Sequence, residues 1–286
     1  MENRTWSLVP RPPGANIITG KWLFRHKLKA DDTLEHYKAR VFMHGFSRRP
    51  DVVFNETFSP TVKAATILIV LTIVAACQWL VHQMDVNNAF LHSRLAKSVY
   101  YQQPASFVAA TSPDHVCLLN KSLYGLKQVP RAWFACFAMF ICGIGFTASR
   151  SDPLLFILHN NSGTAYLLLY VDDIVLTASS SALLQRLQHL LFAQFSMKDL
   201  SSLHYFLDIA VTGMEDGFFL SQRKYAEELL ECARMLDCKP ISTPVDTQSK
   251  LSAANGAPVS DASEYRSLVG ALQHMTMTHS DIAYMV

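Results

Sequence analysis

The stretch YLLLYVDDIVLT, residues 166–177, places two adjacent aspartates between two apolar runs. The runs at 166–171 and 174–177 are rich in Leu, Val, Ile and Tyr, a composition that indicates strands. This pattern predicts a β-hairpin whose tip carries Asp172 and Asp173. Two carboxylates at the tip of an apolar hairpin repel each other, and a bound cation would relieve that repulsion. The stretch therefore predicts a sheet hairpin with a candidate metal site at its tip.

A third carboxylate, Asp85, ends a predicted strand at residues 79–85 and could lie on the neighbouring strand of the same sheet. Carboxylate oxygens are hard ligands that suit Mg²⁺. Three of them could hold two ions, one activating an attacking oxygen and the other binding a triphosphate and its leaving group. An Asp-Asp pair alone is weak support for this hypothesis, because such pairs are common at ordinary turns.

The rest of the chain predicts a mixture of helices and strands. Residues 100–118, with Pro104 and Pro113, indicate a loop. Hairpins are expected from alternating patterns, and helices from longer apolar or amphipathic runs. The expected elements are a hairpin at 21–46, helices at 63–77, 133–144 and 183–195, a hairpin at 205–211 and 217–221, and a helix at 224–236.

Composition and charge limit the function classes. The 286 residues are 50% hydrophobic, enough for a large buried core. Residues 1–50 hold ten Lys and Arg against four Asp and Glu, whereas the rest hold fifteen against nineteen. A basic amino-terminal segment suits a polyanionic partner such as nucleic acid, although charge alone slightly favours a solvated basic surface. The six cysteines lack metal-site spacing and are expected to be buried free thiols.

Membrane insertion and secretion are not expected. The apolar runs at 64–77 and 133–146 are shorter than the roughly 20 residues that a spanning helix needs. The first residues lack the apolar core of a signal peptide. We therefore expect no transmembrane segment and no signal peptide.

Several longer motifs make a family resemblance specific. The motifs are YKAR at 37–40, NETFSPTVK at 55–63, QMDVNNAFL at 83–91, KSLYGLKQVPRAW at 121–133, YVDD at 170–173, SMKDLSSLHYFL at 196–207 and CKPISTPV at 238–245. Through these motifs the chain resembles, in order from residue 6 to residue 286, the reverse transcriptase domain of the Pol polyprotein of copia-type (Pseudoviridae) LTR retrotransposons.

The resemblance implies an α+β right-hand polymerase with fingers, palm and thumb, in which an antiparallel palm sheet packs on helices. The expected subdomains follow the chain in order. They are the first part of the fingers at 1–80, a palm strand with the first catalytic motif at 81–110, a fingers and palm return with the LKQVPRAW motif at 111–150, the palm with the YVDD hairpin and primer grip at 151–215, and a thumb-like helical region at 216–286, truncated before a ribonuclease H domain.

The resemblance also implies an RNA-directed DNA polymerase, a nucleotidyltransferase that adds a deoxynucleoside triphosphate to a primer 3′-hydroxyl. Asp85, Asp172 and Asp173, with the backbone carbonyl of Val86, would hold two Mg²⁺ ions, for which Mn²⁺ can substitute. The implied partners are an RNA or DNA template–primer and a larger polyprotein with integrase and ribonuclease H, in cytoplasmic virus-like particles or the nucleus. The alternative is a catalytically inactive relic that still binds nucleic acid.

Four further residues match nucleotide-binding positions of the family. Phe90 matches the aromatic gate that leaves no room for a 2′-hydroxyl, and without its motif it would be read as a core aromatic. Lys38 and Arg40 match residues that neutralise the triphosphate, although an exposed strand face is as good an interpretation. Gln128 matches the glutamine that packs against the incoming nucleotide near its 3′-hydroxyl.

The remaining matches concern the template, the leaving group and the primer. Arg131 would contact the template backbone or cap the helix that follows. Lys198 would protonate pyrophosphate or serve as a surface residue. Phe206, Leu207 and Asp208 correspond to the primer grip, where Asp208 stands in place of the family's glycine.

Overall fold

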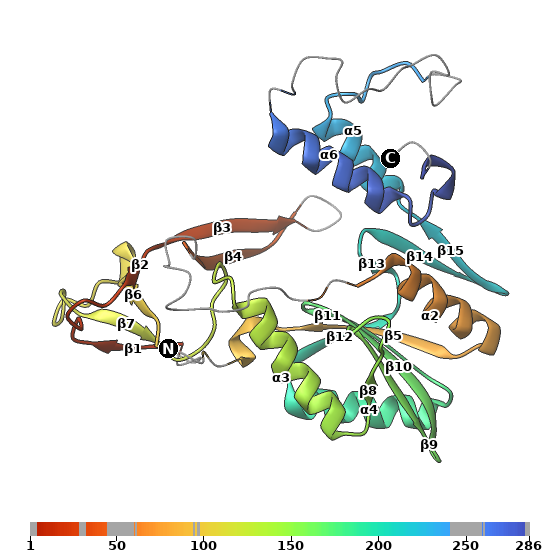
Figure 1. Ribbon diagram of the computed structural model, residues 1–286, viewed down its shortest axis with the longest axis horizontal. Helices are drawn as coiled ribbons and strands as arrows, with labels where there is room; N and C mark the ends of the chain where they lie inside the picture. The colour runs from red at the N-terminus through yellow and green to blue at the C-terminus, as the bar shows by residue number, and fades with distance from the viewer. Residues whose placement is uncertain are drawn as a thin grey trace. The chain divides into compact units, whose positions relative to one another are not determined.

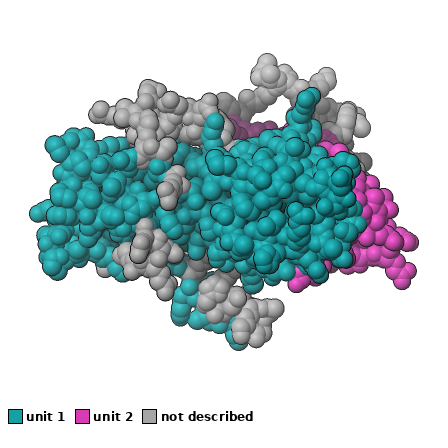
Figure 2. All heavy atoms as spheres, turned by 90° about the horizontal axis from the view of Figure 1, so that it is seen from below, with its two compact units in different colours: residues 1–62, 82–200 teal, residues 63–81, 201–286 magenta. Residues whose placement is uncertain are grey.

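The computed structural model describes residues 5–28, 33–44, 60, 62–93, 95, 98–240, 259 and 261–283 (Figure 1). The chain folds into two compact units, each a mixture of helices and strands. The first unit comprises residues 1–62 and 82–200, and the second comprises residues 63–81 and 201–286 (Figure 2). The second unit is thus built from two separate segments of the chain. The expected subdomain boundaries are not tested by this division and stay predictions.

A six-stranded sheet carries the predicted Asp-Asp hairpin. Its order is β12-β5-β11-β10-β9-β8. In the β10–β11 hairpin Tyr170 pairs with Asp173, so Val171 and Asp172 form a two-residue turn, which confirms the predicted hairpin. The strands are β5 (Leu80–Val86), β8 (Thr147–Ala148), β9 (Leu155–Asn160), β10 (Gly163–Tyr170), β11 (Asp173–Ala178) and β12 (Met197–Ser202).

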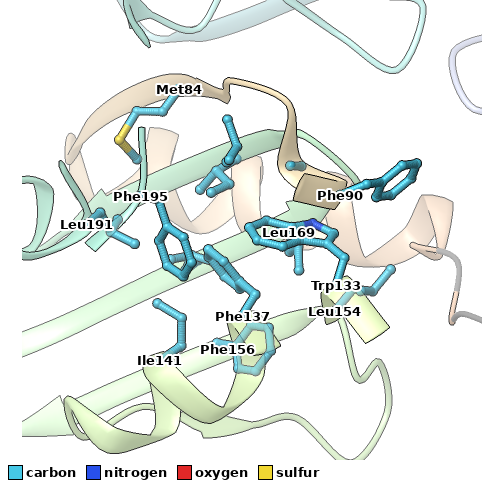
Figure 3. Packing of buried hydrophobic residues seen from close by; sticks show 14 of the residues in the cluster. Met84, Phe90, Trp133, Phe137, Ile141, Leu154, Phe156, Leu169, Leu191 and Phe195 are labelled. Carbon is cyan, nitrogen blue, oxygen red and sulfur yellow. The ribbon is translucent and has the colours of Figure 1, made fainter. Parts of the chain in front are cut away.

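Two helices of the first unit share one buried cluster with this sheet. Helix α3 (Val129–Gly143) has Pro130 in its first turn, where the missing N–H costs no helical hydrogen bond. Helix α4 (Ser181–Gln194) is capped by Ser180, whose hydroxyl accepts from the Leu183 amide. Side chains of both helices meet those of the sheet in the cluster of Figure 3, which includes Trp133, Phe137, Phe156, Leu191 and Phe195. Both helices confirm the helical predictions.

The amino-terminal part contains a long hairpin and a small sheet. Strands β3 (Gly20–Leu28) and β4 (Leu34–Met43) pair antiparallel and confirm the predicted hairpin. The prediction of a loop at residues 100–118 is wrong in part, because two strands of a four-stranded sheet and a 3₁₀ turn form there. The sheet has the order β1 (Trp6–Val9), β7 (Val116–Leu119), β6 (Tyr100–Gln102), β2 (Ile17–Ile18), and the 3₁₀ turn is η3 (Ala105–Phe107).

The second unit confirms one predicted helix and one predicted hairpin closely. Helix α2 (Ala64–Cys77) contacts β15, and β13, β14 and β15 form a three-stranded sheet. Helix α5 ends a turn earlier than predicted, and it packs on α6. The other elements of this unit are β13 (Tyr205–Phe206), β14 (Ile209–Met214), β15 (Gly217–Ser221), α5 (Arg223–Cys232), α6 (Ala262–Met275) and η4 (Ser280–Ile282).

The expectation of buried thiols is wrong for most cysteines. All six are free, but only Cys117 is buried and Cys136 is half-buried. The other four are exposed, and three of these, Cys77, Cys142 and Cys232, stand at or next to the last residue of a helix. Among the described residues, no helix has the length and apolar character needed to cross a membrane.

Candidate active site

The turn that carries the adjacent aspartates has a strained backbone. Val171 has a φ of 54°, in the left-handed region that β-branched residues avoid. Of the two turn residues, only this first one has a positive φ, as in a type II′ turn, where glycine is favoured. The strain of a valine there is about 1–2 kcal/mol. Other contacts must therefore hold the turn in this conformation.

Two hydrogen bonds hold the turn from two different elements. The indole Nε1–H of Trp133 in α3 donates to the Val171 carbonyl at 2.5 Å. The amide of Val86 in β5 donates to the Asp172 carbonyl at 2.8 Å. Because Val86 directly follows Asp85, the second bond brings the end of β5 beside the turn. The structure thus brings together the three aspartates that the sequence singled out.

The electrostatics of Asp173 show how closely these carboxylates interact. Burial, and to a smaller extent the negative charges of Asp172 and Asp85, raise the pKa of Asp173 to about 6. A hydrogen bond from Gln83 acts in the opposite direction. A carboxyl group with a pKa near 6 among other carboxylates is a site of concentrated negative charge.

This charge gives a testable stability effect in the metal-free protein. Since the folded protein holds the Asp173 proton more tightly than the unfolded chain, the contribution of this group to the free energy of unfolding falls as the pH rises from about 4 to about 6. We expect Asp173→Asn to be more stable than the wild type at pH 8 by about 1–2 kcal/mol, a value reduced for partial exposure, and equally stable at pH 4. Urea unfolding with chelator at both pH values measures it. A difference independent of pH would contradict this expectation.

The donor atoms of this site suit a divalent cation. Its donors are carboxylate oxygens, which Mg²⁺ prefers, and their mutual repulsion is what a cation would relieve. Within the described ranges, however, no group of three or more His, Cys, Asp or Glu side chains has the geometry to bind a metal ion. Donor chemistry and charge fit Mg²⁺.

Tyr124 links the aspartates to the predicted nucleotide-binding residues. Its ring lies 4.7 Å from that of Phe90, and the Arg40 guanidinium lies 4.8 Å above it. Burial raises the pKa of Tyr124, Arg40 lowers it, and Asp172 and Asp85 raise it. Arg40, Phe90, Tyr124 and the aspartates therefore form one neighbourhood. Phe90 itself is buried within the 3₁₀ turn η2 (Ala89–His92).

The Arg40 side chain has an unused hydrogen-bond donor. Its Nε is buried and has no acceptor among the described residues. An unsatisfied buried donor of a cation is costly, and an anionic ligand would satisfy it. This feature supports a phosphate-binding role for Arg40. The side chain of Lys38 lies outside what the structure describes, although its backbone pairs with Arg25 in the β3–β4 hairpin.

A close backbone contact positions Tyr124. The Met43 amide at the end of β4 donates to the Tyr124 carbonyl at 2.8 Å. The next residue, Gly125, has a φ of 91°, and a Cβ placed on it would lie 2.2 Å from the Met43 carbonyl oxygen. Only glycine permits this approach. The glycine thus fixes the loop before α3 against the hairpin that carries Arg40.

The other predicted residues of the first unit lie at different positions. Gln128 is half-buried at the N-cap of α3, where its side chain makes no capping hydrogen bond. Arg131 is exposed in the first turn of the same helix. Lys198 is exposed on β12, the strand next to β5. Their roles stay predictions.

The predicted primer grip forms a second tight hairpin, in the second unit. Phe206 is buried and pairs with Ile209, so Leu207 and Asp208 form a two-residue turn. Both have a positive φ, 52° and 59°, as in a type I′ turn, where Asp is well tolerated. The Asp208 carboxylate accepts from the Tyr205 hydroxyl at 3.3 Å. This local geometry shows how an aspartate can stand where the family has glycine.

Helix α6 contacts the same turn. His274 Nε2 donates to the Leu207 carbonyl at 2.9 Å and lies 4.0 Å from the Asp208 carboxylate. The Tyr225 ring of α5 packs edge-on against His274. The aspartate is therefore part of a polar network within its own unit.

With this geometry in view, comparison with known proteins establishes the class. Residues 3–247 match the family model described as reverse transcriptase (RNA-dependent DNA polymerase), and the chain belongs to this family. Among relatives, the chain is 42% and 43% identical over 285 residues to the retrovirus-related Pol polyproteins from transposons RE2 and RE1 of Arabidopsis thaliana. It is 36% identical over 299 residues to that from transposon TNT 1-94 of Nicotiana tabacum.

These relatives confirm the copia-type resemblance. The matches cover 99–100% of this chain but only 19–22% of each relative, so the chain spans about one fifth of their length. The names of these relatives refer to whole Pol polyproteins.

Sequence reasoning missed three residues of the site. Tyr124 stands in the motif at 121–133, between recognised residues, but its ring contacts depend on the tertiary fold. Trp133 ends that motif and was assigned only to a core helix. The strain of Val171 could have been suspected, because a two-residue hairpin turn requires a positive φ at its first residue or at both.

Proposed function

We propose that this chain is the polymerising region of a copia-type reverse transcriptase, which extends a primer on an RNA or DNA template. The observation that supports it best is the cluster of Asp85, Asp172 and Asp173, in which burial, together with the negative charges of Asp172 and Asp85, raises the pKa of Asp173 to about 6. The cluster lies beside Arg40 and Phe90, which suits binding of a triphosphate and its sugar. Carboxylates next to an anion-binding group are typical of two-metal phosphoryl transfer.

The three aspartates, with the backbone carbonyl of Val86, would hold two Mg²⁺ ions, for which Mn²⁺ can substitute. These ions would lower the pKa of the attacking hydroxyl and neutralise charge on the phosphates. In the reaction, the primer 3′-oxygen would give its proton to solvent water and form a bond to the α-phosphorus. The bond from that phosphorus to the bridging oxygen of the β-phosphate breaks, and pyrophosphate leaves. Lys198 is proposed to supply the proton that pyrophosphate takes up.

The remaining residues orient the reactants. Arg40 and Lys38 would neutralise the triphosphate, and Arg40 has the unused buried donor suited to it. Phe90 is held by Tyr124 and would exclude a 2′-hydroxyl from the sugar site. Gln128 would pack against the incoming nucleotide and Arg131 would contact the template backbone. Phe206, Leu207 and Asp208 would hold the primer.

The proposal extends to the architecture and its setting. The β3–β4 hairpin would belong to the fingers, the six-stranded sheet to the palm, and α5 with α6 to the thumb. Since the relatives are Pol polyproteins, we propose that the chain acts within a longer protein with integrase and ribonuclease H. A cytoplasmic virus-like particle or the nucleus would be its place of action.

A primer-extension assay tests this function. The purified chain is incubated with a DNA primer on an RNA template, deoxynucleotides and Mg²⁺, and in parallel with Mn²⁺ or with chelator. We expect extension with either ion and none with chelator. Salt-sensitive template binding without extension under any condition would instead identify an inactive relic that still binds nucleic acid.

A further inference from the structure

The conformation of the aspartate turn is not explained by the turn's own sequence. Val171 is in a left-handed conformation that its β-branched side chain disfavours. Packing does not hold the residue firmly either, because it is about one third exposed and lines a cavity of about 140 Å³ with Phe90 and Trp133. The turn has room to change its conformation, so a specific interaction must keep it in place.

The Trp133 indole supplies that interaction. Its Nε1–H donates to the Val171 carbonyl at 2.5 Å. This carbonyl belongs to the peptide group that joins Val171 to Asp172, so its direction fixes ψ of Val171 and φ of Asp172. The same two dihedral angles set the direction in which the carboxylates of Asp172 and Asp173 leave the turn.

The Trp133 ring is rigidly placed. It is 1% exposed and packs at 5.5 Å from Phe137 and edge-on at 5.4 Å from Phe195 (Figure 3). A donor on a fully packed ring has little freedom to follow a moving acceptor. On the other side of the turn, the Val86 amide holds the Asp172 carbonyl at 2.8 Å.

We propose that Trp133 is a positioning residue, whose indole N–H holds the strained Val171 turn so that Asp172 and Asp173 stay directed toward Asp85. This inference deepens the proposed polymerase function and rests on it for its catalytic consequence. The structural part stands on the turn alone. As a positioning residue, Trp133 would act through the peptide group of Val171 and Asp172, whose carbonyl accepts its indole N–H.

The first test needs no activity and no metal. Trp133→Phe keeps an aromatic ring in the cluster and removes the N–H donor. The Val86 amide reports the position of the Asp172 carbonyl, so its hydrogen exchange is followed by NMR in the metal-free protein. We expect exchange to be about tenfold faster in Trp133→Phe. Phe137→Leu, a packing change on the same helix without that donor, should affect Val86 no more than other core amides.

The second test separates positioning from general destabilisation. Glycine adopts the left-handed conformation without strain, so Val171→Gly should make the turn less dependent on the indole. In the double variant, Val86 exchange should return to within about threefold of Val171→Gly alone. If Trp133→Phe leaves Val86 exchange unchanged, or if Val171→Gly gives no rescue, the proposal is overturned.

Steady-state kinetics test whether the position of the turn affects catalysis. In an active wild type, Trp133→Phe should lower kcat about tenfold and leave KM for the deoxynucleotide within about twofold, with rescue by Val171→Gly. Loss through KM alone would contradict positioning of the aspartates. If the wild type extends no primer, the proposed function fails, whereas the exchange measurements still decide whether Trp133 holds the turn.

Discussion

Asp85→Asn is expected to lower the rate of primer extension by at least about 1000-fold, equivalent to about 4 kcal/mol of transition-state stabilisation. Asparagine has nearly the same shape but removes one of the three negative charges that act together at the β10–β11 turn. The loss should appear in single-turnover rates with Mg²⁺ and with Mn²⁺. Binding of template–primer should change little, because Asp85→Asn leaves unchanged the basic residues that are proposed to bind nucleic acid.

The matched control is Asp199→Asn. Asp199 is a carboxylate of the same sheet, on β12, where it lies 3.7 Å from His82 and outside the three-aspartate cluster. It should retain extension within about twofold of the wild type. Equal losses in the two variants would show that the sheet as a whole, and not the cluster, was disturbed. Equal activity of Asp85→Asn and the wild type would remove the basis of the proposed function.

Gly125→Ala should destabilise the protein by about 3 kcal/mol or more. The new Cβ would lie 2.2 Å from the Met43 carbonyl oxygen, and its backbone has a φ of 91°, so steric overlap and backbone strain act together. Met43 is fully buried and cannot move without disturbing the core. Chemical denaturation at pH 7 measures the loss, and failure to recover folded protein would be its extreme form.

Gly143→Ala serves as the comparison for this substitution. Gly143 is exposed at the end of α3, and a Cβ there meets no atom within 4 Å. Alanine should stabilise this helix end slightly, by about 0.5–1 kcal/mol at most. A similar effect of the two substitutions would contradict the close contact between Gly125 and Met43.

The sequence predicted those parts of the fold whose signals are local. The Asp-Asp hairpin, the β3–β4 hairpin and helix α2 follow from runs of apolar or alternating residues, and the structure has them close to the predicted positions. The short strands β6 and β7 were missed because Pro104 and Pro113 indicated a loop over the whole segment. Strands of three or four residues also give too little periodicity to be recognised.

The candidate site also has a part that could be predicted from local sequence and a part that depends on the tertiary fold. Three aspartates could be named from strand ends and motifs, because their chemistry is visible in the residue types. The interaction between Arg40 and Tyr124 and the bond from Trp133 to Val171 join residues from separate motifs. No local sequence pattern encodes such pairs. In the sequence, Arg40 looks like an ordinary surface residue and Trp133 like an ordinary core residue. Subdomain boundaries and metal binding stay predictions.

The interrupted course of the chain through its two units has a consequence for synthesis. Helix α2 leaves the ribosome long before β15, the strand it contacts in the finished protein. Until β15 has been synthesised, it cannot bury the apolar side chains of α2, among them Leu71 and Val74, which are buried in the folded protein. A nascent chain paused before residue 217 should therefore be a good client for chaperones, and cutting the gene between residues 200 and 201 would not yield two self-sufficient halves.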